Sequence, residues 1–139
     1  MTKYLLIVLL GLFFQEGKYP VIGSIERIDP ALDAVIAPGV KVEIIAEGFD
    51  WSEGPLWIEK SNMLIFSDVP KNTIHKWTEA NGTQLYLSPS GYTGTATRGG
   101  ETGSNGLLLN KKGNLVLCQH GDRRIAVMDA KIDKPKPVF

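Results

Sequence analysis

The amino-acid sequence predicts an all-β fold, and within that class a β-propeller of which about the first two blades are present. From Lys41 onward, short runs of β-branched, aromatic and aliphatic residues alternate with turn residues, which is typical of strands. Three landmark pairs show that the pattern repeats: Glu53 and Asn105 are 52 residues apart, and Ile65 with Val116 and Ile74 with Ile125 are each 51 apart. A period near fifty with four short strands per unit is typical of propeller blades.

The composition is that of one ordinary globular domain. The chain has 139 residues, 43% of them hydrophobic and 22% charged, and its 15 basic and 15 acidic side chains give a formal net charge of zero. A neutral chain has no overall field to hold a phosphate backbone, so we expect no nucleic-acid partner. A single cysteine, Cys118, excludes an internal disulfide framework and paired-thiolate zinc sites within these residues. Because Cys118 follows three apolar residues, we expect it to be buried.

The N-terminus has the pattern of a secretory signal peptide. Lys3 precedes an apolar run over residues 4–14, and polar residues follow it. This run is shorter than the roughly 20 residues of a membrane span but fits the roughly 7–15 of a secretory apolar region. We assign residues 1–23 to a signal peptide and lead-in, and expect an exported protein, periplasmic or secreted, without a stable membrane span. No small-x-small cleavage site follows directly, so the alternatives are a buried core segment or a start codon placed too early.

Residues 24–40 are expected to form an extended N-terminal segment, and residues 41–139 the blades. The segment mixes prolines with scattered isoleucines and shows no period of 2 or 3.6 residues. In the first blade, Asn81-Gly82 is a strong hairpin signal between the last two runs. The apolar runs predicted as strands cover residues 42–45, 56–58, 63–67, 73–77 and 84–87.

The second unit repeats this order. Its predicted strands cover residues 107–109, 115–117 and 124–128, and a fourth strand is expected to start near Lys134-Pro135. Two blades cannot close a ring, so we expect further blades beyond Phe139. The alternative is a small, self-contained β-sandwich.

Two polar residues stand at equivalent places just before the predicted innermost strands. Glu53 and Asn105 are each followed by a glycine. The innermost strand of a blade faces the channel, so we expect both side chains to converge on the axis. A carboxylate and an amide oxygen meeting there form a set of hard oxygen donors suited to Ca²⁺ or Mg²⁺. The alternative interpretation is that both are ordinary turn residues.

The segments Glu53-Gly-Pro-Leu-Trp57, Leu64-Ile-Phe-Ser-Asp68 and Gly103-Ser-Asn-Gly-Leu107 resemble the SMP-30, gluconolactonase and luciferin-regenerating family. The run from Gly113 to Ile125 is similar to its bacterial gluconolactonase-like members, and the similarity covers about residues 42–128. It implies a six-bladed propeller with a divalent ion, Ca²⁺ or another such as Mg²⁺ or Zn²⁺, at the centre of the channel. The implied substrates are sugar lactones.

Carried onto this sequence, the resemblance places Glu53 on the metal and Asn105 beside it as a substrate contact. The other two family ligands, an asparagine and an aspartate, fall outside these residues. Some members carry an arginine where this chain has Gly103, and we expect Arg98, from the rewritten loop 91–103, to bind substrate in its place. That glycine-rich loop is expected to be a lid or rim loop.

The implied reaction is Lewis-acid hydrolysis of a lactone ester bond, in which the ion polarises the carbonyl. We name His120 as the candidate catalytic base within these residues and expect His75, on a strand, to be solvated. Two alternatives are an ion-plugged binding or scaffold propeller without turnover, and an arylesterase-like lactonase that uses His120. We expect the 139 residues alone to be inactive, and the sequence assigns no oligomeric state.

Overall fold

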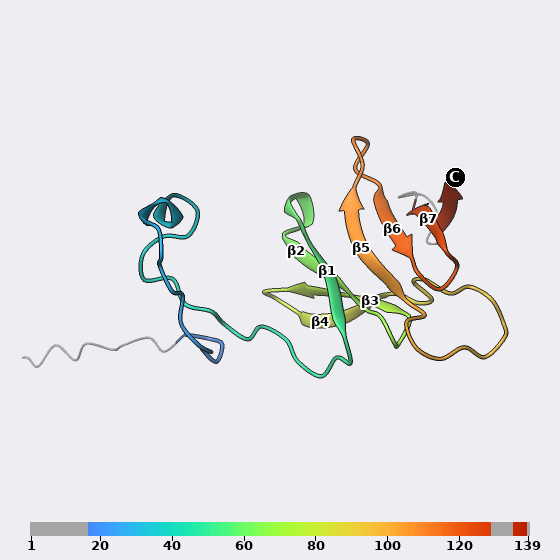
Figure 1. Ribbon diagram of the computed structural model, residues 1–139, viewed down its shortest axis with the longest axis horizontal. Helices are drawn as coiled ribbons and strands as arrows, with labels where there is room; N and C mark the ends of the chain where they lie inside the picture. The colour runs from blue at the N-terminus through green and yellow to red at the C-terminus, as the bar shows by residue number, and fades with distance from the viewer. Residues whose placement is uncertain (1–16, 129–134, 139) are drawn as a thin grey trace, which may run out of the picture. The chain divides into compact units, whose positions relative to one another are not determined.

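The structure, a computed structural model, describes residues 17–128 and 135–138, and the chain divides into two compact units, residues 1–45 and 46–139 (Figure 1). The apolar run predicted to direct secretion lies outside the described residues. Within the described residues, no helix is long and apolar enough to cross a membrane.

The described part of the first unit is organised around a short 3-10 helix, η1 (Pro30–Ala34). Asp29 caps it, because its Oδ1 accepts a hydrogen bond of 2.7 Å from the Ala31 N–H. Arg27 then ties the helix to the chain that follows, since its guanidinium binds the Asp33 carboxylate and donates to the carbonyls of Ile36 and Ala37. Local polar contacts therefore hold this segment together.

The strand predicted over residues 42–45 is wrong. Glu43 makes a single antiparallel bridge to Val21, with Ile22 N–H donating to the Val42 carbonyl and Ile44 N–H donating to the Pro20 carbonyl. Proline has no N–H to continue the ladder on one side, and Gly23, at φ +62°, turns the chain away on the other. The pairing therefore ends after one bridge.

The second unit contains two four-stranded antiparallel sheets, each a meander in sequence order. The first sheet contains β1 (Ser52–Ile58), β2 (Met63–Asp68), β3 (Thr73–Thr78) and β4 (Gly82–Leu87). The second contains β5 (Ser104–Leu109), β6 (Leu115–Gln119), β7 (Arg124–Met128) and β8 (Pro135–Val138), and a short 3-10 helix, η2 (Glu59–Ser61), links β1 to β2. The predicted all-β class and the predicted repeat of four strands are confirmed.

The turns explain why the chain reverses where it does. Asn62 and Asn72 have φ values of 46° and 57°, and Gly82 and Gly113 have φ values of 61° and 80°. Asparagine and glycine tolerate this left-handed backbone, which favours hairpin turns. The prolines of β8 lie on the last strand of its sheet, where a missing N–H costs least.

The hydrophobic core lies between the two sheets, whose first strands β1 and β5 run side by side (Figure 1). Ile65 and Ile74 of the first sheet and Leu117 of the second have no exposed surface. Leu87 and Leu115 complete the buried cluster. Burying a side chain of this size contributes about 1.5–3 kcal/mol, so this contact is a main source of the unit's stability.

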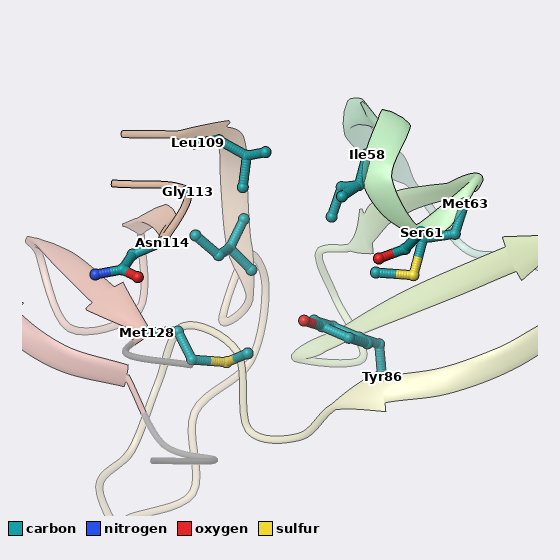
Figure 2. A pocket seen from close by; sticks show the side chains of 9 residues that line it. Ile58, Ser61, Met63, Tyr86, Leu109, Gly113, Asn114 and Met128 are labelled. Carbon is teal, nitrogen blue, oxygen red and sulfur yellow. The ribbon is translucent and has the colours of Figure 1, made fainter. Parts of the chain in front are cut away.

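The contact between the sheets is looser at the end where β1 and β5 finish. A pocket of about 160 Å³ opens there. Figure 2 shows Ile58, Met63 and Tyr86 facing Leu109 and Met128 across it. The better-packed end is therefore the one at which β1 and β5 begin, which is also the end that carries the predicted site residues.

The face of the second sheet that points away from the first is open. Leu108 is 51% exposed and Ile125 is 44% exposed, and Cys118 beside Ile125 is exposed as well. The expectation that Cys118 is buried is therefore wrong. Alternation along β6 turns Leu117 into the core and Cys118 away from it.

His75, expected to be solvated, is instead partly buried. Its ring lies 5.0 Å from that of Phe49 and 5.8 Å from that of Phe66, and its Nε2 is 3.1 Å from the Thr73 hydroxyl. This aromatic cluster covers the face of the first sheet opposite to the core, so the histidine contributes to packing there.

Candidate functional site

Glu53 and Asn105 both lie at β-bulges, in the first strands of the two sheets, β1 and β5. In β1 the pairing shifts between Glu53 and Leu56, and in β5 it shifts between Ser104 and Leu107, so that two residues oppose one in each sheet. A bulge bends the strand and re-aims the side chains beside it. The repeat seen in the sequence therefore includes this bulge, which lies near the start of both β1 and β5.

The two bulges are packed against each other. A Cβ added to Gly54 would overlap the carbonyl oxygen of Asn105 and would come 3.1 Å from the Gly106 Cα. Gly54 also has a φ of +57°, so both its conformation and its closeness to β5 require glycine. Because Glu53 directly precedes this contact, the structure brings Glu53 and Asn105 to the same place.

A buried pair of hydroxyls joins the strands behind the bulges. Ser67 Oγ lies 2.8 Å from Ser104 Oγ and donates to the Asn105 carbonyl at 3.2 Å. Both serines are fully buried. Ser67 pairs with Glu53 in the β1–β2 ladder, so this pair fixes the backbones that carry both site residues.

The side-chain oxygens of Glu53 and Asn105 take no part in these contacts. Asn105 Oδ1 is buried and has no hydrogen-bond partner among the described residues. In the same part of the chain, no hydrogen bond or ion pair engages the half-buried Glu53 carboxylate. A buried acceptor without a partner costs about 1–3 kcal/mol, which is typical of a position that binds a ligand.

His120 lies at the same end of the second sheet, in the turn between β6 and β7. It lines a shallow pocket of about 220 Å³ together with Asn105. Cys118 and Arg123 are among the other lining residues. The structure therefore brings the candidate base and the candidate substrate contact to one pocket, and its lining carries groups that donate and accept hydrogen bonds.

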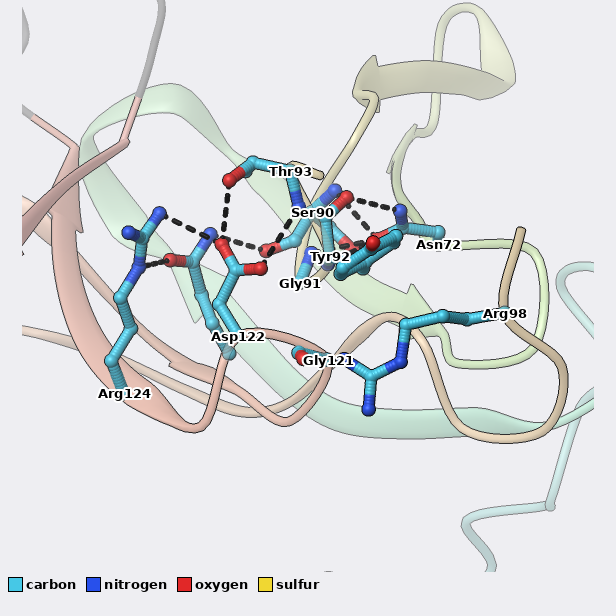
Figure 3. Close-up of polar contacts among 10 residues, drawn as sticks. Asn72, Ser90, Gly91, Tyr92, Thr93, Arg98, Gly121, Asp122 and Arg124 are labelled. Atoms are coloured by element: carbon cyan, nitrogen blue, oxygen red, sulfur yellow. Dashed lines mark hydrogen bonds and ion pairs between the residues drawn. The ribbon is translucent and has the colours of Figure 1, made fainter. Parts of the chain in front are cut away.

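The loop 88–103 connects the sheets, and one asparagine holds its start. Asn72 Oδ1 accepts hydrogen bonds of 3.1, 2.7 and 3.1 Å from the N–H groups of Ser90, Gly91 and Tyr92. Its Nδ2 donates to the Tyr92 carbonyl at 2.8 Å. Figure 3 shows the Asn72 side chain beside Ser90, Gly91 and Tyr92. This role of Asn72 was not predicted from the sequence. The available signal was that an asparagine ends the turn at residues 69–72.

Asp122 holds the next part of the loop. Its carboxylate accepts from the Thr93 N–H at 3.1 Å and from the Thr93 hydroxyl at 2.6 Å, and it forms an ion pair of 2.9 Å with Arg124 (Figure 3). Gln119, almost fully buried, completes the network by donating to the Ser90 carbonyl and accepting from Arg124. The loop is thus fixed to the second sheet as well as to the first.

Arg98 contacts this framework. Its Nη1 donates to the Gly121 carbonyl at 2.5 Å, and its guanidinium lies 4.9 Å from the centre of the Tyr92 ring. Figure 3 shows the side chain extended toward Gly121. It is not among the residues that line the pocket of His120 and Asn105.

Three glycines make the close packing of this loop possible. A Cβ on Gly91 would overlap Gly103, and a Cβ on Gly121 would overlap the Thr102 carbonyl oxygen. A Cβ on Gly103 would lie 2.6 Å from the Val69 carbonyl oxygen. Side chains at these positions would push the loop away from both sheets.

An ion-pair cluster lies where the chain enters β1. Asp68 is 1% exposed and accepts hydrogen bonds from the N–H groups of Asp50 and Trp51. Lys71 Nζ lies 3.0 Å from the Asp50 carboxylate and 3.8 Å from that of Asp68. The hydrogen bond to Asp50 is the main reason that the pKa of Lys71 is raised above its ordinary value.

Comparison with known proteins identifies the family. The family model for the SMP-30/gluconolactonase/LRE-like region matches residues 51–137. A gluconolactonase from Zymomonas mobilis subsp. mobilis is 38% identical over 110 residues, which cover 78% of this chain and 31% of that protein. The chain therefore spans about a third of the length of this relative.

Solved structures agree on the fold. A gluconolactonase from Xanthomonas campestris is similar with a TM-score of 0.64 at 23% identity, over 89% of this chain and 36% of that one. An X-ray structure assigned to a gluconolactonase family gives a TM-score of 0.53 at 30% identity, over 67% of this chain and 28% of that one. The family match, which covers more than half of the chain, shows that this protein belongs to the SMP-30/gluconolactonase/LRE-like family.

Proposed function

We propose that the protein hydrolyses a sugar lactone, with a divalent ion bound where the innermost strands of its blades begin. The observation that carries this proposal is the buried Asn105 Oδ1, which has no partner in the described part of the chain and lies on the bulge packed against Gly54, next to Glu53. The family shares its name with gluconolactonases, and this supports the reaction class.

The residues present fit a hard divalent ion. Glu53 would bind it through its carboxylate, and Asn105 would present its amide oxygen to the ion or to the substrate beside it. Oxygen donors of this kind suit Ca²⁺ and Mg²⁺ better than Zn²⁺. In the described residues no group of three or more His, Cys, Asp or Glu side chains gathers to hold a metal, so further ligands would come from other parts of the protein. When bound, the ion would supply charge that polarises the lactone carbonyl.

The surroundings of these two residues support binding over a purely structural role. The bulges re-aim the side chains, and the Ser67–Ser104 pair and the Gly54 contact fix the backbones that carry them. A rigid backbone lets a site bind a ligand without further loss of conformational entropy. Arg98 contacts Gly121 and Tyr92, and its predicted contact with substrate remains part of this proposal.

A closed propeller, six-bladed as in the family, would complete the site. The open face of the second sheet corresponds to the face of the first sheet that is buried under the second. The residues on the open face follow those on the buried face by 51 positions: Val116, Cys118 and Ile125 follow Ile65, Ser67 and Ile74. A further sheet packed on this face would cover it in the way that the second sheet covers the first. In such an arrangement the first strand of the next sheet would begin beside His120. Val69 is the residue of the first sheet that corresponds to His120, and it accepts a hydrogen bond from Gly103, which directly precedes β5.

The test is lactone hydrolysis by the protein expressed from its complete gene. Glucono-δ-lactone would be the substrate, with Ca²⁺ titrated back after chelation, and Glu53→Gln would be compared with Glu59→Gln, a substitution at the far end of β1. We expect metal-dependent turnover that falls at least about 100-fold in Glu53→Gln and is unchanged in the control. A folded, ion-binding protein without turnover on several lactones would favour a scaffold role, and a preference for aryl esters would favour the arylesterase alternative.

A further inference from the structure

The three tryptophans of the sequence differ in their surroundings. Trp77 is 8% exposed and takes part in packing. Trp57 is 45% exposed, and its indole N–H donates to the Glu59 carboxylate at 2.9 Å. Trp51 is 48% exposed, and no hydrogen bond or ring contact with another described residue engages its indole. Trp51 is therefore a large apolar ring that this part of the chain leaves open.

The strand pairing places Trp51 on the same face of the first sheet as Glu53. Glu53 pairs with Ser67 of β2, and the Val69 N–H donates to the Trp51 carbonyl at 3.1 Å, which continues this pairing just before β1 begins. Residues two apart along a strand lie on the same face of the sheet. That face is turned toward β5, because Ser67 Oγ meets Ser104 Oγ there. Trp51 thus stands at the start of β1, on the side of the candidate metal ligand.

Further sheets of a closed propeller would not cover this place. One would pack on the open face of the second sheet, and another on the outer face of the first, where Phe49 and Phe66 lie with ring centres 4.8 Å apart. Trp51 lies on neither face, because it belongs to the side that already meets the second sheet. That contact is in place, since the Gly103 N–H donates to the Val69 carbonyl at 2.7 Å. The indole would therefore stay open in the complete ring.

The backbone that carries the indole is held from below. The Asp68 carboxylate, 1% exposed, accepts the Trp51 N–H at 3.2 Å and the Asp50 N–H at 3.3 Å. Lys71 Nζ lies 3.0 Å from the Asp50 carboxylate and ties the same segment to the turn after β2. A ring on a fixed backbone loses little further conformational entropy when it binds a ligand.

We propose that Trp51 is a substrate-binding residue that stacks on the apolar face of a six-membered sugar-lactone ring bound beside Glu53. This inference rests on the proposed function for its reaction. One face of such a ring presents C–H groups while its hydroxyls point outward, so an indole buries apolar surface and leaves the hydroxyls hydrated. Two residues of extended chain span about 7 Å, so one lactone reaches both side chains. Trp51 thus selects for the ring, and Glu53 acts at the carbonyl end.

Kinetics of the protein from the complete gene test the stacking role. Trp51→Ala should raise KM for glucono-δ-lactone about 10-fold with kcat changed less than about twofold, because the contact is the same in the ground and transition states. Trp51→Phe keeps an aromatic face and should stay within about threefold in KM. Trp57→Ala, at the far end of the same strand, should behave as the wild type. An unchanged KM in Trp51→Ala, or a loss of kcat shared with Trp51→Phe, would overturn the proposal and leave lactone hydrolysis standing.

A second measurement does not depend on turnover. The complete protein labelled with fluorotryptophan gives a ¹⁹F NMR signal for each indole, and Trp51→Phe and Trp57→Phe identify two of them. The probe is anhydroglucitol, a pyranose ring without a carbonyl that cannot be hydrolysed. We expect a saturable shift of the Trp51 signal and none of the Trp57 signal. A Trp51 signal that does not move while the sugar inhibits turnover would refute the stacking. The expected shift without any lactone turnover would keep the sugar platform and reject the proposed reaction.

Discussion

The ends of β2 and β6 are equivalent in the two sheets, yet their side chains lie in different surroundings. Ser67 and Cys118 are 51 residues apart and stand at matching places, with Ser67 paired to Ile74 and Cys118 paired to Ile125. Ser67 is fully buried under β5, whereas Cys118 is exposed. The same strand position is a core position in one sheet and a surface position in the other. What decides is whether another sheet packs on that face, and the local sequence does not record this.

The turns that follow these strands show the same contrast. Asn72 and Arg123, also 51 residues apart, both have a left-handed backbone, with φ values of 57° and 55°. The Asn72 side chain holds the loop that leads to the next sheet, through three accepted hydrogen bonds. The Arg123 side chain lines the pocket of His120. One turn geometry thus serves two purposes, and the side chain at the left-handed position determines which.

The bulge glycines offer the sharpest way to break the equivalence of the sheets. Gly54→Ala should lower the free energy of unfolding by about 4 kcal/mol, because it adds left-handed strain to an overlap with the Asn105 carbonyl. Gly106→Ala, at the equivalent position of β5, should cost less than about 1 kcal/mol, since its Cβ would meet Cys118 Sγ at an ordinary 3.6 Å. Urea unfolding followed by tryptophan fluorescence measures both. Equal losses would mean that the two bulges are packed alike in the complete protein.

The two left-handed turn residues provide the next comparison. Asn72→Ala should cost about 2–3 kcal/mol, because it removes the acceptor for three N–H groups and strains the backbone. Arg123→Asn should be neutral or stabilising by about 0.5 kcal/mol, since asparagine adopts this backbone more readily. Urea unfolding again provides the measurement. A large loss in Arg123→Asn would show that this arginine has a structural partner outside the described residues.

The pair Ser67 and Cys118 gives a smaller effect and tests whether a further sheet covers the second one. Ser67→Ala should cost about 1–2 kcal/mol, because it leaves the buried Ser104 hydroxyl without its side-chain partner. If a further sheet packs on the open face, Cys118 of the folded complete protein should react slowly with a thiol reagent and rapidly after unfolding. Peptide mapping by mass spectrometry follows this residue. Rapid labelling of the folded protein would contradict the closed propeller.

Lys71 gives the smallest effect, and its equivalent in the second sheet is the oppositely charged Asp122. Asp50 raises the pKa of Lys71 in the folded state above its ordinary value of 10.5. A raised pKa means that the folded state holds this proton more tightly, so the contribution is fully present below the ordinary value and is lost as pH rises past it. The stability of the wild type should therefore fall more steeply above pH 10.5 than that of Lys71→Met. Parallel curves would show that the ammonium adds nothing.

The strand order could be predicted well because apolar alternation and turn residues are local signals. The repeat of 51 to 52 residues was enough to place Glu53 and Asn105 at equivalent positions of two units. Cys118 and His75 were mispredicted because their burial depends on a neighbouring sheet and on an aromatic cluster formed with Phe49. The strand expected over residues 42–45 failed because its partner contains a proline, which becomes visible only when the pairing is known.

The roles of Asn72 and Asp122 were missed because they act at long range. Asn72 binds residues 18–20 positions later, and Asp122 binds a residue 29 positions earlier. A single sequence carries no signal for such pairs. Arg98 was expected to bind substrate, and that role stays a prediction, while the structure adds its contacts with Gly121 and Tyr92.

The glycines at 91, 103 and 121 have a consequence for how this sequence can vary. Each sits where backbone meets backbone and any Cβ would collide, so the constraint is one of volume and holds whatever the chemistry of the replacement. In a saturation scan we expect these positions to tolerate no substitution, while the exposed tip between them, residues 95–97, accepts most. The loop is thereby free to diverge in sequence at its tip, while its path between the two sheets stays the same.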